Sequence, residues 1–149
     1  MTMIVEEASF FDIPQLCDLL ALLFEQEVEF HPDPAKQTAA LTLLIDNPLR
    51  GRIFVLREGD TLLGMVSVQV LVSTACGGDV LLLEDLVIHP TYRKRGFGSF
   101  LLEHVIRFAK QSGYHRITLL TDRINENAQR FYSRHGFTAS DMAPYRLLF

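Results

Sequence analysis

The chain of 149 residues is 48% apolar and 21% charged, a balance typical of a globular domain rather than a disordered segment. Its formal net charge of −4 excludes a strongly basic polyanion binder, and we expect no nucleic-acid partner. The two cysteines and five histidines show neither a disulfide framework nor a ligand spacing, so we expect no metal. The sequence has no secretory pattern and no long apolar run, so we expect a cytoplasmic protein with no membrane partner.

Hydrophobic periodicity and turn residues predict five elements in the first half of the chain. Residues 2–6 are typical of a short strand, and Asp12 and Pro14 mark the start of a helix over residues 15–25. A second helix is predicted over residues 35–46, before Asn47-Pro48. Two strands, over residues 52–58 and 61–73 with a Gly-Asp turn between them, predict a β-hairpin.

The second half alternates strands and helices. A nearly continuous apolar run predicts a central strand over residues 80–88, followed by an amphipathic helix over 97–111, a strand over 116–121 and a helix over 125–135. One or two strands are predicted over residues 137–149, with Pro144 limiting their pairing. The strands that flank the amphipathic helix should be parallel. The prediction is one α/β domain over residues 1–149, with a mixed sheet of about six to seven strands and helices on both faces.

The segment Arg93-Lys94-Arg95-Gly96-Phe97-Gly98-Ser99 is the least expected part of the sequence. Three cations stand where a helix begins, although the N-terminus of a helix dipole favours anions. No Ser, Thr, Asp or Asn stands at the cap, so the first N–H groups lack a side-chain partner. A surface turn with solvated charges leaves these conflicts unexplained, whereas a bound polyanion removes them. The segment therefore predicts a phosphate-bearing ligand.

Three blocks, in the same order, resemble the GCN5-related N-acetyltransferases (GNAT). They are the loop Arg93-x-x-Gly96-x-Gly98, the strand with its exit at residues 84–90, and Asn125-x-x-Ala128-x-x-Phe131-Tyr132 followed by His-Gly-Phe. The resemblance is strong over residues 80–137. It implies the GNAT fold with splayed central strands. It also implies a transferase that moves an acetyl group from acetyl-CoA to a primary amine, of a small molecule, peptide or protein, in a ternary complex.

The resemblance also implies how acetyl-CoA is held. Backbone N–H groups of residues 95–99 would bind the pyrophosphate, and strand backbone would pair with the pantetheine arm. Asn125 would bond the same arm, or else act only as a helix cap. The expected cofactor-binding residues are Leu86, Val87, Ile88, Arg93, Lys94, Arg95, Gly96, Phe97, Gly98, Ser99, Asn125 and Tyr132.

Two residues are expected to be catalytic by this resemblance. The amine must be neutral to attack, so a base or proton path is needed. Glu84 matches that base, acting through water, with Asp85 expected on the opposite sheet face; alternatively, either carboxylate pairs with a cation. Tyr132 matches the acid that protonates the departing thiolate, or else its ring packs in the core. Both alternating rows of residues in the strand over 80–88 are apolar. The sequence therefore does not decide which face of this strand meets the bound acetyl-CoA.

By the same resemblance, the acceptor is expected at the first two helices and the loop between them. Glu25, Glu27, Glu29 and Asp33 in that region would attract a cationic amine, unless they form only a solvated helix end. The alternative function is a catalytically idle acyl-CoA binding or sensing module. A different nucleotide-binding domain is disfavoured, because neither Gly-x-Gly-x-x-Gly nor Gly-Lys-Ser/Thr occurs. Many relatives pair through sheet edges or C-terminal strands, and the apolar residues 145–149 are compatible with a homodimer.

Overall fold

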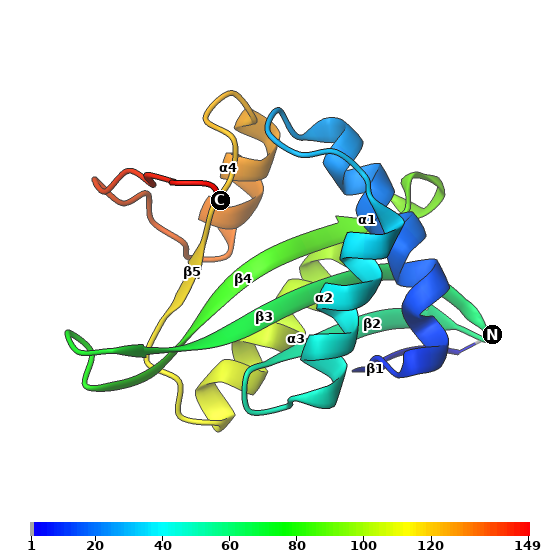
Figure 1. Ribbon diagram of the computed structural model, residues 1–149, viewed down its shortest axis with the longest axis horizontal. Helices are drawn as coiled ribbons and strands as arrows, with labels where there is room; N and C mark the ends of the chain where they lie inside the picture. Colours follow the sequence, from blue (N-terminus) through cyan, green and yellow to red (C-terminus); the bar gives the residue numbers. More distant parts are fainter. Residues whose placement is uncertain (1) are drawn as a thin grey trace.

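A five-stranded mixed sheet forms the centre of the computed structural model, which describes residues 2–149 (Figure 1). The strands lie in sequence order: β1 (Met3–Glu7), β2 (Gly51–Glu58), β3 (Thr61–Ser73), β4 (Gly78–Ile88) and β5 (Ile117–Leu119). Neighbours are antiparallel except β4 and β5, which are parallel. The predicted hairpin and the predicted parallel pair are therefore confirmed.

Helices cover both faces of this sheet. α1 (Ile13–Gln26) and α2 (Pro34–Asp46) lie on one face, and α3 (Phe97–Gln111) lies on the other (Figure 1). α4 (Glu126–Arg134) follows β5, and two short 3₁₀ turns, η1 (Phe10–Asp12) and η2 (Pro90–Tyr92), complete the list for the described residues. Each predicted helix is found within two residues of its expected ends. No helix in the described part of the chain has the length and apolarity to span a bilayer.

The prediction of one or two strands over residues 137–149 is wrong. This segment forms neither helix nor strand, and β5 is shorter than predicted because it pairs with β4 only over Leu81–Leu83. The C-terminal segment instead reaches the connection between α1 and α2: Arg146 forms an ion pair with Glu29 at 2.5 Å and lies over the Phe30 ring. Pro144 has no N–H to donate to a strand partner. Over residues 2–149 the sheet therefore has five strands rather than six or seven.

Two apolar cores lie on the two faces of the sheet. The core beneath α3 contains Leu101, Leu102 and Val105 with residues of β2, β3 and β4. The core beneath α1 and α2 contains Leu16, Leu20 and other residues of those strands. Alternate strand residues enter alternate cores, as a pleated sheet requires. Both faces of the sheet are therefore packed against helices.

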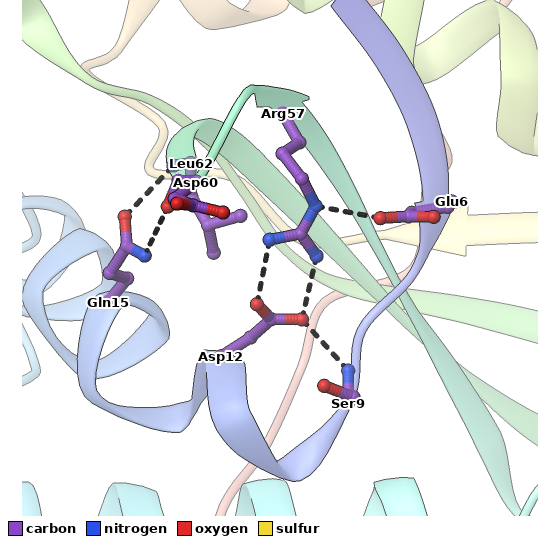
Figure 2. Close-up of polar contacts among 7 residues, drawn as sticks. All are labelled: Glu6, Ser9, Asp12, Gln15, Arg57, Asp60 and Leu62. Carbon is purple, nitrogen blue, oxygen red and sulfur yellow. Dashed lines mark hydrogen bonds and ion pairs between the residues drawn. The ribbon is translucent and has the colours of Figure 1, made fainter.

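A buried ion pair fixes the start of α1 to the β2–β3 hairpin (Figure 2). Both terminal nitrogens of Arg57 donate to the Asp12 carboxylate at 2.9 Å, and its Nε donates to Glu6 at 2.7 Å. The backbone N–H of Ser9 also donates to Asp12. Burial alone would raise the pKa of Asp12, but the bonds from Arg57 and Ser9 outweigh burial and the pKa is lowered. This ion pair anchors α1, whose far end carries part of the candidate site.

Candidate active site

A β-bulge at Glu84 changes which residues of β4 face each core. Ser67 of β3 pairs with Asp85, while the next residue, Val68, pairs with Leu83, so Glu84 is the extra residue. Before the bulge, Leu81 and Leu83 enter the α3 core; after it, Leu86 and Ile88 do so, and Val87 enters the α1 core. The bulge breaks the regular alternation from which opposite faces were expected for Glu84 and Asp85. It leaves Glu84 exposed.

Beyond the bulge, β4 has a strand partner on one side only. Pairing with β5 ends at Leu83, so Glu84–Ile88 pairs with β3 alone. The His89 N–H donates to the Leu63 carbonyl at 2.8 Å. The alternation of an antiparallel ladder then turns the backbone groups of Ile88 and Leu86 toward the open edge and those of Val87 toward β3. Leu86 and Ile88 can therefore pair with an extended ligand, whereas this alternation directs the Val87 groups to β3; a pantetheine contact at Val87 stays a prediction.

The loop before α3 has the backbone conformation of an anion-binding nest. Lys94 has φ +63° and is the one non-glycine residue with positive φ among residues 2–149; Gly96 has φ +80°. No side chain caps α3, and within the described chain the N–H groups from Lys94 to Ser99 have no hydrogen-bond partner. The side chains of Arg93, Lys94 and Arg95 are exposed around them. The residues present therefore fit a pyrophosphate.

The loop is tied to its surroundings by its first and last residues. Arg93 Nε donates to the Ile88 carbonyl at 3.1 Å, and its terminal nitrogens face the side-chain amide of Gln26 at the end of α1. Ser99 Oγ lies 2.9 Å from His135 Nε2, just after α4. Arg93 thus holds β4 and α1 together, and the loop is connected to three other elements of the fold.

Carboxylates from three elements meet beside the open end of β4. Glu27, just beyond α1, is partly buried and makes no ion pair within residues 2–149. Burial, with the charges of Asp85, Asp122 and Glu84, raises the pKa of Glu27 to about 7. Burial also raises the pKa of Asp85 to about 6, although the Ser67 hydroxyl, 2.8 Å away, opposes this shift. With pKa values of about 7 and about 6, Glu27 and Asp85 can each change protonation state near neutral pH.

Tyr132 of α4 lies beside this cluster. Its ring packs edge-on against Phe131 and Phe137, with centroids 5.2 and 5.7 Å apart. Burial, and then the negative charge of Glu27, raises the pKa of Tyr132 to about 12. α4 and the end of α1 come together at the upper end of the sheet (Figure 1). Core packing and a role of the phenol in proton transfer are therefore compatible. The ring packs against two other rings, while the charge of Glu27 affects the pKa of the hydroxyl.

The other predicted site residues make local contacts within the fold. Asn125 caps α4, since its Oδ1 accepts from the Ala128 N–H at 3.1 Å; a bond to pantetheine stays a prediction. Phe97 packs in the α3 core, and Gly98 lies against Phe131 and Ile88. No group of three or more potential metal ligands occurs in the part of the chain that the structure describes.

Glu27 and His135 are the residues whose position the sequence did not reveal. Glu27 was expected only as one of four acidic residues near the first two helices, and His135 only as part of the His-Gly-Phe that follows Tyr132. Their proximity to Tyr132 and Ser99 arises from the packing of α1 and α4 against the same end of the sheet. Glu27 is separated from Tyr132 by most of the chain, so no local spacing could have indicated the pair.

Comparison with known proteins places this geometry in a family. The model of the acetyltransferase (GNAT) family matches residues 13–137. The chain is 39% identical over 56 residues to Streptothricin acetyltransferase A of Bacillus subtilis, a match that covers 38% of this chain and 32% of that relative. It is 26% identical over 121 residues to the uncharacterized N-acetyltransferase YhfO of the same species, covering 79% of this chain and 80% of YhfO.

A solved structure shows the same fold. The "predicted acetyltransferase with acetyl-CoA from Clostridium acetobutylicum" superposes with a TM-score of 0.81 at 18% identity, over 98% of this chain and 96% of that one. At this identity the likeness establishes the fold alone. The family match covers most of the chain, including β4, the nest and α4. The chain therefore belongs to the acetyltransferase (GNAT) family.

Proposed function

We propose that the protein transfers an acetyl group from acetyl-CoA to a primary amine, directly in a ternary complex. The observation that carries the proposal is the meeting of three features at one end of the sheet. These are the unpaired N–H groups of Lys94–Ser99, the open backbone edge at Leu86 and Ile88, and the group of Glu27, Asp85 and Tyr132. Acetyl-CoA is a thioester, so its acetyl group is activated for attack by an amine. The CoA thiolate that leaves needs only a proton.

The donor would be held by backbone rather than by side chains. The nest offers N–H groups to the pyrophosphate, and Lys94 and Arg95 add charge at its rim. The Ile88 N–H and the N–H and C=O of Leu86 offer strand-like pairing to the pantetheine arm. The Ile88 carbonyl already accepts from Arg93, which fixes the edge in its extended form. Such pre-ordered groups lose little entropy on binding.

Glu27 is the general base in this proposal. The proton of the attacking amine would reach Glu27 through Glu84 and water. A base is most effective when its pKa lies near the working pH, and the pKa of Glu27 is raised to about 7. Glu84 stays a candidate by its resemblance to the family base. It is exposed in the bulge and its charge contributes to the shift at Glu27. In this proposal a water molecule would carry the proton between the two carboxylates.

Glu27 and Tyr132 are coupled in a way that suits the reaction. While Glu27 is charged, it contributes to the raised pKa of Tyr132 and keeps the phenol protonated. When Glu27 takes the proton of the attacking amine, this contribution disappears and Tyr132 becomes a stronger acid. The phenol is thus best able to donate when the thiolate leaves. The order of the two proton transfers follows from electrostatics.

The acceptor class follows from the sign of the charges. Glu27, Asp85, Glu84 and Asp122 would favour a cationic amine over an anionic one. A cavity of about 380 Å³ between α1 and α2, lined in part by Phe24, Glu29 and Phe30, lies in the connection that carries Glu27. Its lining also includes Lys36, and Glu29 already pairs with Arg146, so the preference for a cationic amine rests on the carboxylates beside β4.

Thiol release from acetyl-CoA tests this function directly. The purified protein is assayed with polyamines, amino acids, aminoglycosides and peptides, and we expect release with at least one cationic amine. Thermal unfolding is measured in parallel with CoA, acetyl-CoA, NAD and ATP, and we expect a shift with CoA and acetyl-CoA. Stabilisation by ATP or NAD alone would contradict the proposal. Binding of CoA without release by any amine would favour the idle acyl-CoA module.

A further inference from the structure

His135 lies outside the chemistry proposed above, yet two contacts hold its side chain in place. Its Nε2 is 2.9 Å from Ser99 Oγ, and its ring packs on Phe131 with centroids 5.0 Å apart. Both His135 and Ser99 are partly buried. The end of α4 does not require this imidazole, because the His135 backbone N–H already donates to the Tyr132 carbonyl at 3.0 Å. The side-chain contact therefore needs another explanation.

Ser99 stands at the end of the nest. It is the third residue of α3, and the Cα–Cβ bond of a helical residue tilts toward the helix N-terminus. Its hydroxyl therefore leans toward the N–H groups of Lys94–Ser99, which have no partner among residues 2–149. A serine hydroxyl is one more donor for an anion held by those groups, provided that its proton is free.

The direction of the hydrogen bond decides whether that proton is free. A serine hydroxyl has one proton and two lone pairs, and an imidazole nitrogen either donates or accepts according to its tautomer. If His135 Nε2 accepts, the Ser99 proton is used in the bond. If Nε2 donates, Ser99 Oγ accepts and its proton can point to an anion in the nest. An anion favours the second arrangement.

We propose that His135 is a positioning residue for the coenzyme, donating its Nε2 proton to Ser99 Oγ so that the Ser99 hydroxyl donates to the pyrophosphate. This inference rests on the proposed function, because it takes the nest as the pyrophosphate site. It adds the residue that directly follows α4 to the binding of the donor. Tyr132 lies three residues before His135, so the same bond also fixes the phenol relative to the nest.

Calorimetric titration with CoA tests the inference on the full chain. The variants are His135→Phe, which keeps a ring against Phe131; His135→Gln, which keeps a side-chain N–H donor; Ser99→Ala; and the double variant His135→Phe/Ser99→Ala. Ser133→Ala is the matched control, because Ser133 is exposed on the same helix and its side chain makes no hydrogen bond within residues 2–149. Thermal unfolding without ligand checks the fold of each variant.

We expect His135→Phe and Ser99→Ala each to raise the Kd for CoA about tenfold, as loss of one hydrogen bond to a charged group does. The double variant should be no worse than either single variant, since both remove the same donor. His135→Gln should restore most of the affinity, and Ser133→Ala should bind like the wild type. In bound CoA, the ³¹P signals of the diphosphate should move in His135→Phe and return in His135→Gln.

Three results would overturn the inference: an unchanged Kd in His135→Phe, losses that add in the double variant, or ³¹P signals identical in the wild type and His135→Phe. If His135→Phe does not fold, Ser99→Ala and His135→Gln carry the same comparison. Failure of the proposed function looks different: either the wild type itself does not bind CoA, or it binds CoA and releases no thiol with any amine.

Discussion

The Ser67 hydroxyl lies 2.8 Å from Oδ2 of Asp85, across the β3–β4 ladder and directly beside the bulge at Glu84. Both residues project to the α1 face, and Ser67 is almost fully buried. The bond supports the charged form of a carboxylate that burial would otherwise keep neutral. The charge state of Asp85 in turn affects Glu27. The proton affinity of the site is thus set partly by a serine on a neighbouring strand.

Ser67→Ala should raise the pKa of Asp85 further, because it removes the bond that lowers the pKa and leaves the burial that raises it. Carboxyl-carbon NMR titration of Asp85 measures the change directly. Ser73→Ala is a matched control, since Ser73 is also buried on β3 but its hydroxyl accepts from the Cys76 N–H. An Asp85 titration that is unchanged in Ser67→Ala would contradict the role given to this bond.

Glu27→Gln should lower activity about 10²-fold, as loss of a general base does, and yet stabilise the fold above neutral pH. The pKa of Glu27 is about 7 when folded and 4.5 as its ordinary value, so the folded state binds the extra proton between these values. Stability from this group therefore falls as pH rises from about 4.5 to about 7. Glutamine removes that loss, so the melting temperature at about pH 8 should rise by about 2–4 °C. This shift corresponds to roughly 1 kcal/mol of unfolding free energy in a chain of this size.

Glu25→Gln provides the comparison for Glu27→Gln, because Glu25 is exposed at the end of α1, two residues before Glu27. It should change neither rate nor melting temperature appreciably. The wild-type kcat/KM should also rise as the pH passes about 7, the pKa of Glu27. This rise should be absent from Glu27→Gln. A rise that persists in Glu27→Gln would remove Glu27 as the base.

Local patterns in the sequence were sufficient for the helices, the hairpin and the loop before α3. Pro14, the Gly59-Asp60 turn and the glycines of the nest act through their own backbone geometry, which is why they can be recognised one segment at a time. The bulge at Glu84 has no such signal. Leu81-Leu82-Leu83 before it and Leu86-Val87-Ile88 after it are apolar in both rows, so a change of face leaves the pattern unaltered.

The features that were missed depend on contacts distant in sequence. Phe137–Phe149 has enough apolar residues for a strand, but Arg146 binds Glu29 and Phe30 instead of continuing the sheet. Burial, and then the charges of Asp85 and Asp122, raise the pKa of Glu27, and only the folded chain provides both. Residue type indicated which side chains could do chemistry, and packing determines which of them act together.

Asp12→Asn should destabilise the fold by about 3–5 kcal/mol near neutral pH, because Arg57 would lose its buried partner. The pKa of Asp12 is lowered from its ordinary value of 3.8, so its stabilisation is present above that value and is lost as pH falls through the folded pKa. The wild type and Asp12→Asn should therefore converge in strong acid. Urea unfolding across a pH series measures this convergence.

Glu7→Gln removes an exposed ion pair, with Arg52, and is the matched comparison for Asp12→Asn. The Glu7 side chain is 51% exposed against 6% for Asp12, and surface pairs contribute about 0–1 kcal/mol. Glu7→Gln should thus unfold within about 1 kcal/mol of the wild type. Equal losses in the two variants would show that burial does not govern the strength of the Asp12–Arg57 pair.

Tyr132→Phe should lower kcat by about 10²-fold or more while the Kd for acetyl-CoA changes little, because it removes the donor and keeps the packed ring. Thiol-release kinetics give kcat, and calorimetric titration gives the Kd for acetyl-CoA. Tyr114→Phe is the control, since Tyr114 also packs against a ring, that of Phe108, at 5.8 Å. Unchanged turnover in Tyr132→Phe would leave its hydroxyl without a catalytic role.

Gly96→Asp should abolish CoA binding, because a carboxylate at the centre of the nest repels the pyrophosphate and blocks its approach. The substitution also forces an L residue into the left-handed region, so a control must carry the same strain. Gly77→Asp does so: Gly77 has φ +78° against +80° for Gly96, and a Cβ at either position meets no atom within 4 Å. The two variants should melt at similar temperatures, and Gly77→Asp alone should bind CoA with the wild-type Kd in calorimetric titration. Retained binding by Gly96→Asp, or equal loss by both variants, would show that the loop before α3 does not hold the pyrophosphate.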